Sequence, residues 1–78
     1  MAELLLEHAQ KKLIRYRAMS RAFEDKYGQS FASFRQDVLR VEPGFEQERD
    51  YFDWELAVTG IADVEEEIVR LRSLSARS

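Results

Sequence analysis

The chain has 78 residues, 35% charged and 45% hydrophobic, with a net charge of −3 at pH 7. This length allows one domain, and the composition is typical of a folded protein rather than a disordered tail. The absence of cysteine excludes disulfides and thiolate metal sites. No run of about 18 apolar residues occurs, and MAELLLEHAQKK lacks the basic start and long apolar segment of a signal peptide. We therefore expect a single cytoplasmic domain over residues 1–78 that is not embedded in a membrane.

Residues 2–27 predict a long helix. Apolar side chains recur there at steps of three and four residues, which places them on one face: Leu6, Ala9, Leu13, Tyr16, Phe23 and Tyr27. Ser20 interrupts this stripe and is small enough to lie where two helices cross closely. We expect Gly28 to end the helix, because glycine adopts the left-handed conformation of a C-terminal cap without strain.

Residues 31–40 predict a short second helix. Ser30 suits its N-cap, since a serine hydroxyl can accept a hydrogen bond from a free backbone N–H of the first turn. Phe31, Phe34 and Val38 continue the helical spacing. The stretch EPGF over residues 42–45 then ends the helix, because Pro43 disfavours helical backbone at the residue before it and Gly44 permits a turn.

Residues 46–74 predict a second long helix. Its apolar seam repeats at three, four, three, four and three residues: Trp54, Ala57, Ile61, Val64, Ile68 and Leu71. Trp54 should therefore point inward, with Asp50, Asp53 and Glu55 flanking it on the outward side. Gly60 lies beside the seam, which indicates either close approach by another helix or a local break in this one.

Two long helices joined through a short one fold back as a hairpin. A single hairpin would leave several apolar residues without a partner: Phe52, Leu56, Ile14 and Leu4. Pairing of two hairpins into a four-helix bundle would cover them. The expected fold is thus an all-α helical hairpin that forms a homodimer, or a monomer that docks onto another protein.

Charge divides unevenly along the chain. Residues 1–40 contain eight bases and five acids, a net charge of +3, whereas residues 41–78 contain four bases and ten acids, a net charge of −6. Such a division can mean two different partners, or two halves that attract each other within the fold.

Motifs for catalysis or for binding a cofactor or metal are absent from the sequence. His8 is the single histidine, and Glu3 and Glu7 do not form the Glu-x-x-His pattern of metal-binding bundles with it. Asp63, Glu66 and Glu67 fit a solvated acidic face. We therefore expect no enzyme activity, cofactor or metal. Basic residues cluster around Tyr16, but the chain is acidic overall and shows no basic recognition helix, which argues against nucleic-acid binding.

Three stretches resemble a family of very short prokaryotic proteins: KYGQSFASF (26–34), DYFDWE (50–55) and VEEEIVRLRSL (64–74). They are similar to the small antitoxin-like partners of toxin–antitoxin modules, although Ala32 and Ser33 stand where such proteins often carry acids. The resemblance implies a helical protein that masks a basic toxin, often a ribonuclease. It also implies a partner-binding surface with Trp54 as an anchor and with Asp50, Asp53 and Glu55 facing the basic cleft.

Two hypotheses of different class follow. In the first, the chain is a protein-binding module that neutralises a basic partner through an acidic helix face. The expected surface comprises Asp50, Asp53, Trp54, Glu55, Phe52 and Leu56. In the second, it is a structural or scaffold dimer without a toxin partner.

Overall fold

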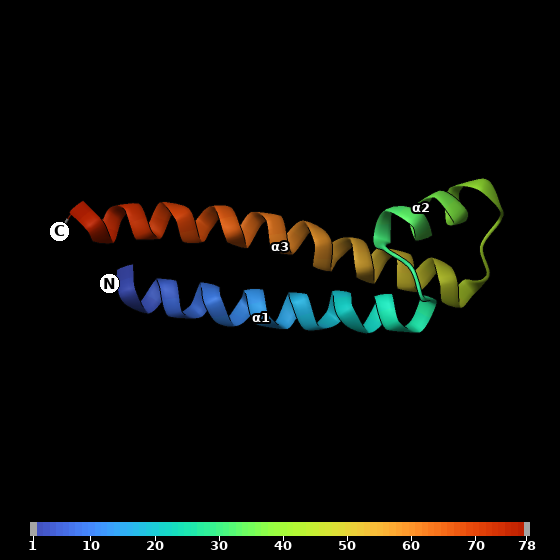
Figure 1. Cartoon of the computed structure of the whole chain (residues 1–78), viewed down its shortest axis with the longest axis horizontal. Helices are drawn as coiled ribbons and strands as arrows, with labels where there is room; N and C mark the ends of the chain where they lie inside the picture. Colours follow the sequence, from blue (N-terminus) through green and yellow to red (C-terminus); the bar gives the residue numbers. More distant parts are fainter. Residues whose placement is uncertain (1, 78) are drawn as a thin grey trace.

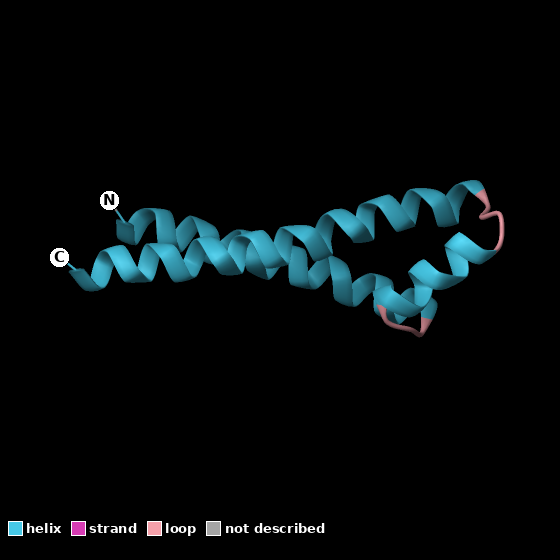
Figure 2. Ribbon diagram, turned by 90° about the horizontal axis from the view of Figure 1, so that it is seen from above, coloured by secondary structure: helices cyan, strands magenta, loops and turns pink. Residues whose placement is uncertain are grey.

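The computed structural model describes residues 2–77 and contains three helices: α1 (Ala2–Tyr27), α2 (Phe31–Arg40) and α3 (Phe45–Arg77). α1 and α3 lie side by side and antiparallel, so both ends of the chain lie together, and α2 covers the opposite end, where the chain turns (Figure 1). Helices account for nearly all of residues 2–77 and no strand occurs among them, which confirms the predicted all-α class (Figure 2). Of the expected bounds, only those of the last helix differ, by one residue at its start and three at its end.

The core is the seam between the two long helices. Ala9 of α1 and Val64, Ile68 and Leu71 of α3 are buried in one cluster. Three partly buried α1 side chains pack against that cluster: Leu6, Leu13 and Tyr16. The spacing of apolar residues at three and four positions therefore predicted the buried face of both helices correctly. In the α3 seam, Ile61 is the one member that is only half-buried.

α1 and α2 end where the sequence predicts. Gly28 has φ = 63°, the left-handed conformation that favours glycine. The hydroxyl of Ser30 accepts a hydrogen bond from the backbone N–H of Ser33 at 3.2 Å, which caps α2. Residues 41–44 are not helical, as Pro43 and Gly44 indicated. These short connections hold the three helices close to one another.

Gly60 lies inside a continuous α3, so the alternative of a local break is wrong. A Cβ atom at this position would lie only 2.7 Å from Cε2 of Tyr16. The aromatic ring of Tyr16 therefore occupies the space that any other residue at position 60 would need. Close approach is confirmed, although a side chain of α1 makes it rather than the α1 backbone.

Four apolar side chains stay outside the hairpin, as the sequence predicted: Leu4, Ile14, Phe52 and Leu56, each 58–69% exposed. The molecule measures 52 × 18 × 17 Å, so it is a rod two helices thick. Within the described part of the chain, none of the helices combines the length and apolarity needed to cross a membrane.

Gly60→Ala tests the contact with Tyr16. Alanine favours a helix interior by about 1 kcal/mol relative to glycine, but overpacking a filled core typically costs about 1–3 kcal/mol. We expect a net loss of about 1 kcal/mol in the free energy of unfolding, measured by urea denaturation. Gly44→Ala is the matched control, because its Cβ would meet nothing within 4 Å. A more stable Gly60→Ala protein would contradict the close contact.

Candidate protein-binding surface

Trp54 of α3 is enclosed by aromatic rings from the other two helices. Its exposed fraction is 0%, and the ring stacks on Phe23 of α1 with centroids 5.6 Å apart. Phe31 and Phe34 of α2 each approach it to 5.3 Å. The indole Nε1–H donates a hydrogen bond to Oγ of Ser20 at 3.0 Å, so the polar end of the ring is satisfied inside the protein.

Asp50 lies one helical turn before Trp54 and faces the same interior. It is 5% exposed. Its Oδ2 accepts hydrogen bonds from Nζ of Lys26 at 2.6 Å and from the Tyr27 hydroxyl at 2.5 Å. Lys26 also reaches the carboxylate of Glu46 at 2.8 Å. This network ties the end of α1 to the start of α3.

The network also fixes the ionisation of its members. Burial by itself raises the pKa of Asp50, but the hydrogen bonds from Lys26 and Tyr27 outweigh it, so the pKa lies below its usual value. Hydrogen bonds to Asp50 and then to Glu46 raise the pKa of Lys26. Burial, and after it the hydrogen bond to Asp50, raise the pKa of the Tyr27 phenol. At neutral pH the arrangement is therefore a carboxylate held by an ammonium group and a neutral hydroxyl.

The six residues expected at a partner surface fall into two groups. Asp53, Glu55, Phe52 and Leu56 are exposed. Trp54 is buried, as its place on the seam predicted, so its indole does not reach the surface. The expectation that Asp50 faces outward is wrong, because position 50 is four residues before Trp54 on the same helical face and its charge is neutralised from α1.

Phe52 and Leu56, the two apolar members of the exposed group, belong to a longer apolar strip on the outer side of α3. Phe45 lies seven residues before Phe52, and Leu56 follows four residues later, so the three share one face. Their exposed fractions are 83%, 60% and 58%. We call Phe45, Phe52 and Leu56 the outer strip. Asp53 and Glu55 lie on its two sides, since each is one position from a member of the strip and helical residues turn about 100° apart.

Much of the acidic charge of α3 is used within the fold. Lys12 lies 3.6 Å from Glu67, and Arg17 lies 3.4 Å from Glu65. With the Lys26 pairs, these contacts run along the hairpin and support the interpretation that the two halves attract each other. Among the described residues, several exposed acids of α3 form no ion pair: Glu48, Asp53, Glu55 and Asp63.

Unpaired bases remain on α1. Lys11, Arg15 and Arg21 are exposed and form no ion pair within residues 2–77. Four exposed acids of α1 also form no ion pair there, so α1 presents both signs of charge to solvent: Glu3, Glu7, Glu24 and Asp25. The described residues hold no group of three or more His, Asp or Glu side chains placed to bind a metal ion.

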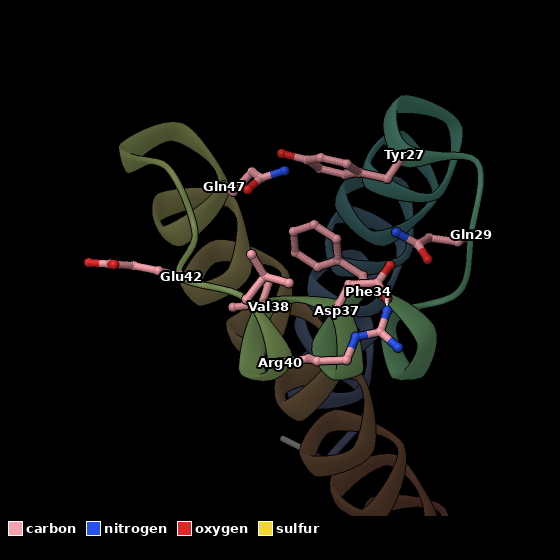
Figure 3. Close-up of a pocket in the computed structure, with 9 residues that line it drawn as sticks. Tyr27, Gln29, Phe34, Asp37, Val38, Arg40, Glu42 and Gln47 are labelled. Carbon is pink, nitrogen blue, oxygen red and sulfur yellow. Dashed lines mark hydrogen bonds and ion pairs between the residues drawn. The ribbon is translucent and has the colours of Figure 1, made fainter.

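A hollow of about 310 Å³ lies between α2 and the two turns (Figure 3). Phe34 and Val38 form its apolar floor, and Asp37 pairs with Arg40 at 2.9 Å on its rim. The Glu42 carboxylate points away from it in Figure 3. Because its rim charges neutralise each other, the hollow has no isolated charge that would select a ligand, and the outer strip remains the stronger candidate surface.

Comparisons with protein-family models, curated proteins and solved structures found no match for the chain. The resemblance to antitoxin-like proteins therefore rests on its three short motifs alone.

Two features of this region were missed from the sequence. Phe45 could have been found, because its spacing to Phe52 is helical once the helix is allowed to begin one residue earlier. The contact of Asp50 with Lys26 and Tyr27 joins residues 23 and 24 positions apart, and no local pattern indicates it.

The hydrogen bonds of Asp50 make a pH-dependent contribution to stability. Its folded pKa is below the unfolded value of about 3.9, so the stabilisation is present above that pH and is lost as pH falls through the folded pKa. Because Lys26 is itself partly exposed, we expect Asp50→Asn to cost about 1–2 kcal/mol at neutral pH and little in acid. Urea denaturation across the acidic range measures this. Asp53→Asn, at an exposed residue without an ion pair, is the control. Parallel stability curves for wild type and Asp50→Asn would contradict the role of the carboxylate.

Proposed function

We propose that the chain is a non-enzymatic protein-binding module that uses the outer side of α3 to bind a basic protein. The observation that carries this proposal is the outer strip, three large apolar side chains more than half exposed and flanked by carboxylates without ion pairs. Exposed apolar side chains gathered on one helix face, with a charged border, are typical of interaction surfaces.

The two components of this surface would act differently. Phe45, Phe52 and Leu56 supply apolar area that a partner can remove from water. Asp53 and Glu55 supply a negative field that speeds association with a positive surface and disfavours acidic partners. The binding residues expected from the sequence are thereby revised: Phe45 is added, and Asp50 and Trp54 become the interior support of the surface.

The resemblance to antitoxin-like proteins gives the partner a class, a toxin enzyme of ribonuclease type. Such an enzyme needs a positive cleft for RNA, and an acidic, partly apolar helix could occupy that cleft in place of RNA. The ion pairs between α1 and α3 are compatible with this role, because they neutralise acids on the inner side of α3 and leave those beside the outer strip free.

A structural dimer without a toxin is the second candidate function. It is favoured by apolar side chains on the other flank of the hairpin, Ile14 and Val69, which are 69% and 68% exposed. The two functions use different surfaces, so a dimer could also bind a basic protein.

Co-purification with the product of the neighbouring gene tests the proposal. We expect Asp53→Lys combined with Glu55→Lys to slow association by about tenfold and to weaken its dependence on salt, because exposed charges steer encounter and are screened by ions. Phe52→Ser combined with Leu56→Ser should instead speed dissociation, because apolar burial holds the complex together.

The matched control is Glu3→Lys combined with Glu7→Lys, which changes the net charge by the same amount at exposed positions of α1. Circular dichroism establishes that helix content is unchanged in each variant. Equal recovery of the partner by wild type and by both α3 variants would show that the outer strip is not the binding surface. A neighbouring product that is acidic, or that does not bind wild type, would contradict the antitoxin-type role.

A further inference from the structure

A groove follows one flank of the seam between α1 and α3. It consists of two adjoining hollows that share Ile14 and Arg17. One extends along α3 past Glu65 and Val69, and the other reaches Ile61. We call this the seam groove, defined by Ile14, Arg17, Ile61, Glu65 and Val69. No residue of the outer strip lines it.

The groove has an apolar side chain exposed on each helix. Ile14 of α1 is 69% exposed and Val69 of α3 is 68% exposed. The half-buried Ile61 and the edge of the buried Ile68 lie beside them. An occupant that covers this surface must therefore contact both long helices, as another pair of helices does.

The charges of the groove differ from those of the outer strip. Arg17 and Glu65 face each other at 3.4 Å, one from each helix, and their side chains are 59% and 52% exposed. Each therefore has free capacity for a second ion pair. Arg21, Glu24 and Arg72 line the groove as well. A partner of a single sign would therefore attract some of these groups and repel others, so the groove suits an occupant that carries both signs.

We infer that the occupant is a second copy of this chain, related by a two-fold axis parallel to the helices. Rotation about such an axis keeps every residue at its level along the hairpin and places α1 of one copy over α3 of the other. Arg17 of each copy then lies over Glu65 of the other copy, which gives four charges of alternating sign. A two-fold axis across the helices at this level would instead place Arg17 over Arg17 and Glu65 over Glu65.

The resulting assembly is a four-helix bundle with both α2 ends on the same side. Its interface is isologous, because the same groove is used by both copies. The outer strip stays exposed, so this dimer specifies the geometry of the second candidate function and does not depend on the proposed binding of a basic protein.

Sedimentation equilibrium tests the dimer. Wild type should sediment at twice the chain mass of 9.2 kDa, whereas Ile14→Glu and Val69→Glu should each sediment as monomers, because each buries a carboxylate at the apolar contact. Leu4→Glu on α1 and Leu56→Glu on α3 are matched controls at exposed leucines outside the groove, and both should remain dimeric. A monomeric wild type, or dimers that persist in both groove variants, would overturn the proposal.

The ion pairs give an independent test. Arg17→Glu and Glu65→Arg should each be monomeric alone, because each carries one sign of charge at the contact. A mixture of equal amounts should be dimeric, since both pairs across the interface then join opposite charges, although the 17–65 pair within each copy has like charges. A mixture that stays monomeric would show that these residues do not meet across the interface.

The distance between two spin labels, one on each copy, tests the direction of the two-fold axis. The chain has no cysteine, so Glu42→Cys carries a single spin label at the turn end of each copy. An axis parallel to the helices places the two labels at the same end of the bundle, and we expect a short distance by pulsed electron resonance. A separation approaching the 52 Å length of the molecule would overturn the parallel arrangement.

Discussion

The burial of Trp54 is the interaction on which the rest of the structure depends. Two helices can pair along a seam of small and aliphatic side chains, but nothing in such a seam holds a third helix. Trp54 does, because Phe23 of α1 and Phe31 and Phe34 of α2 all pack on its ring. The indole can be fully buried only because Ser20 accepts its N–H. Ser20, the small polar residue that interrupts the apolar stripe of α1, is thus required for the burial of Trp54 on α3.

Asp50 fixes the alignment of the two long helices. Sliding α1 along α3 by one turn would cost little in a seam of repeated aliphatic contacts, but it would take Asp50 away from Lys26 and Tyr27 and leave a buried carboxylate without its hydrogen bonds. The contact of Tyr16 with the bare backbone at Gly60 restricts the same movement from the middle of the hairpin. The position at which the outer strip begins is therefore set by interactions on the inner side of α3.

Local rules predicted most of the fold. The spacing of apolar residues identified both long helices, and the preferences of Gly28, Ser30 and Pro43 located the breaks between them, because those preferences act within a few residues. The candidate site was less predictable. A flanking acid such as Asp53 and a buried acid such as Asp50 look alike in sequence, and what separates them is whether the other helix provides a donor at the same level. The exposure of Phe52 and Leu56 followed from the seam, since both lie outside it.

Symmetry explains why the two candidate surfaces suit different partners. In a dimer with a two-fold axis, each surface patch contacts the same patch of the other chain. If two chains paired through the outer strip, the carboxylates of Asp53 and Glu55 would therefore lie close to the same carboxylates of the partner. Its acidity therefore disfavours self-association through this face while it favours a basic partner. The seam groove is lined by charged residues of both signs, and the proposed rotation, which exchanges the two helices, would place the Arg17–Glu65 ion pair of one copy against that of the other and so add two attractive contacts. The proposed binding of a basic protein and the proposed pairing with a second copy would thus use surfaces that differ in their response to two-fold symmetry.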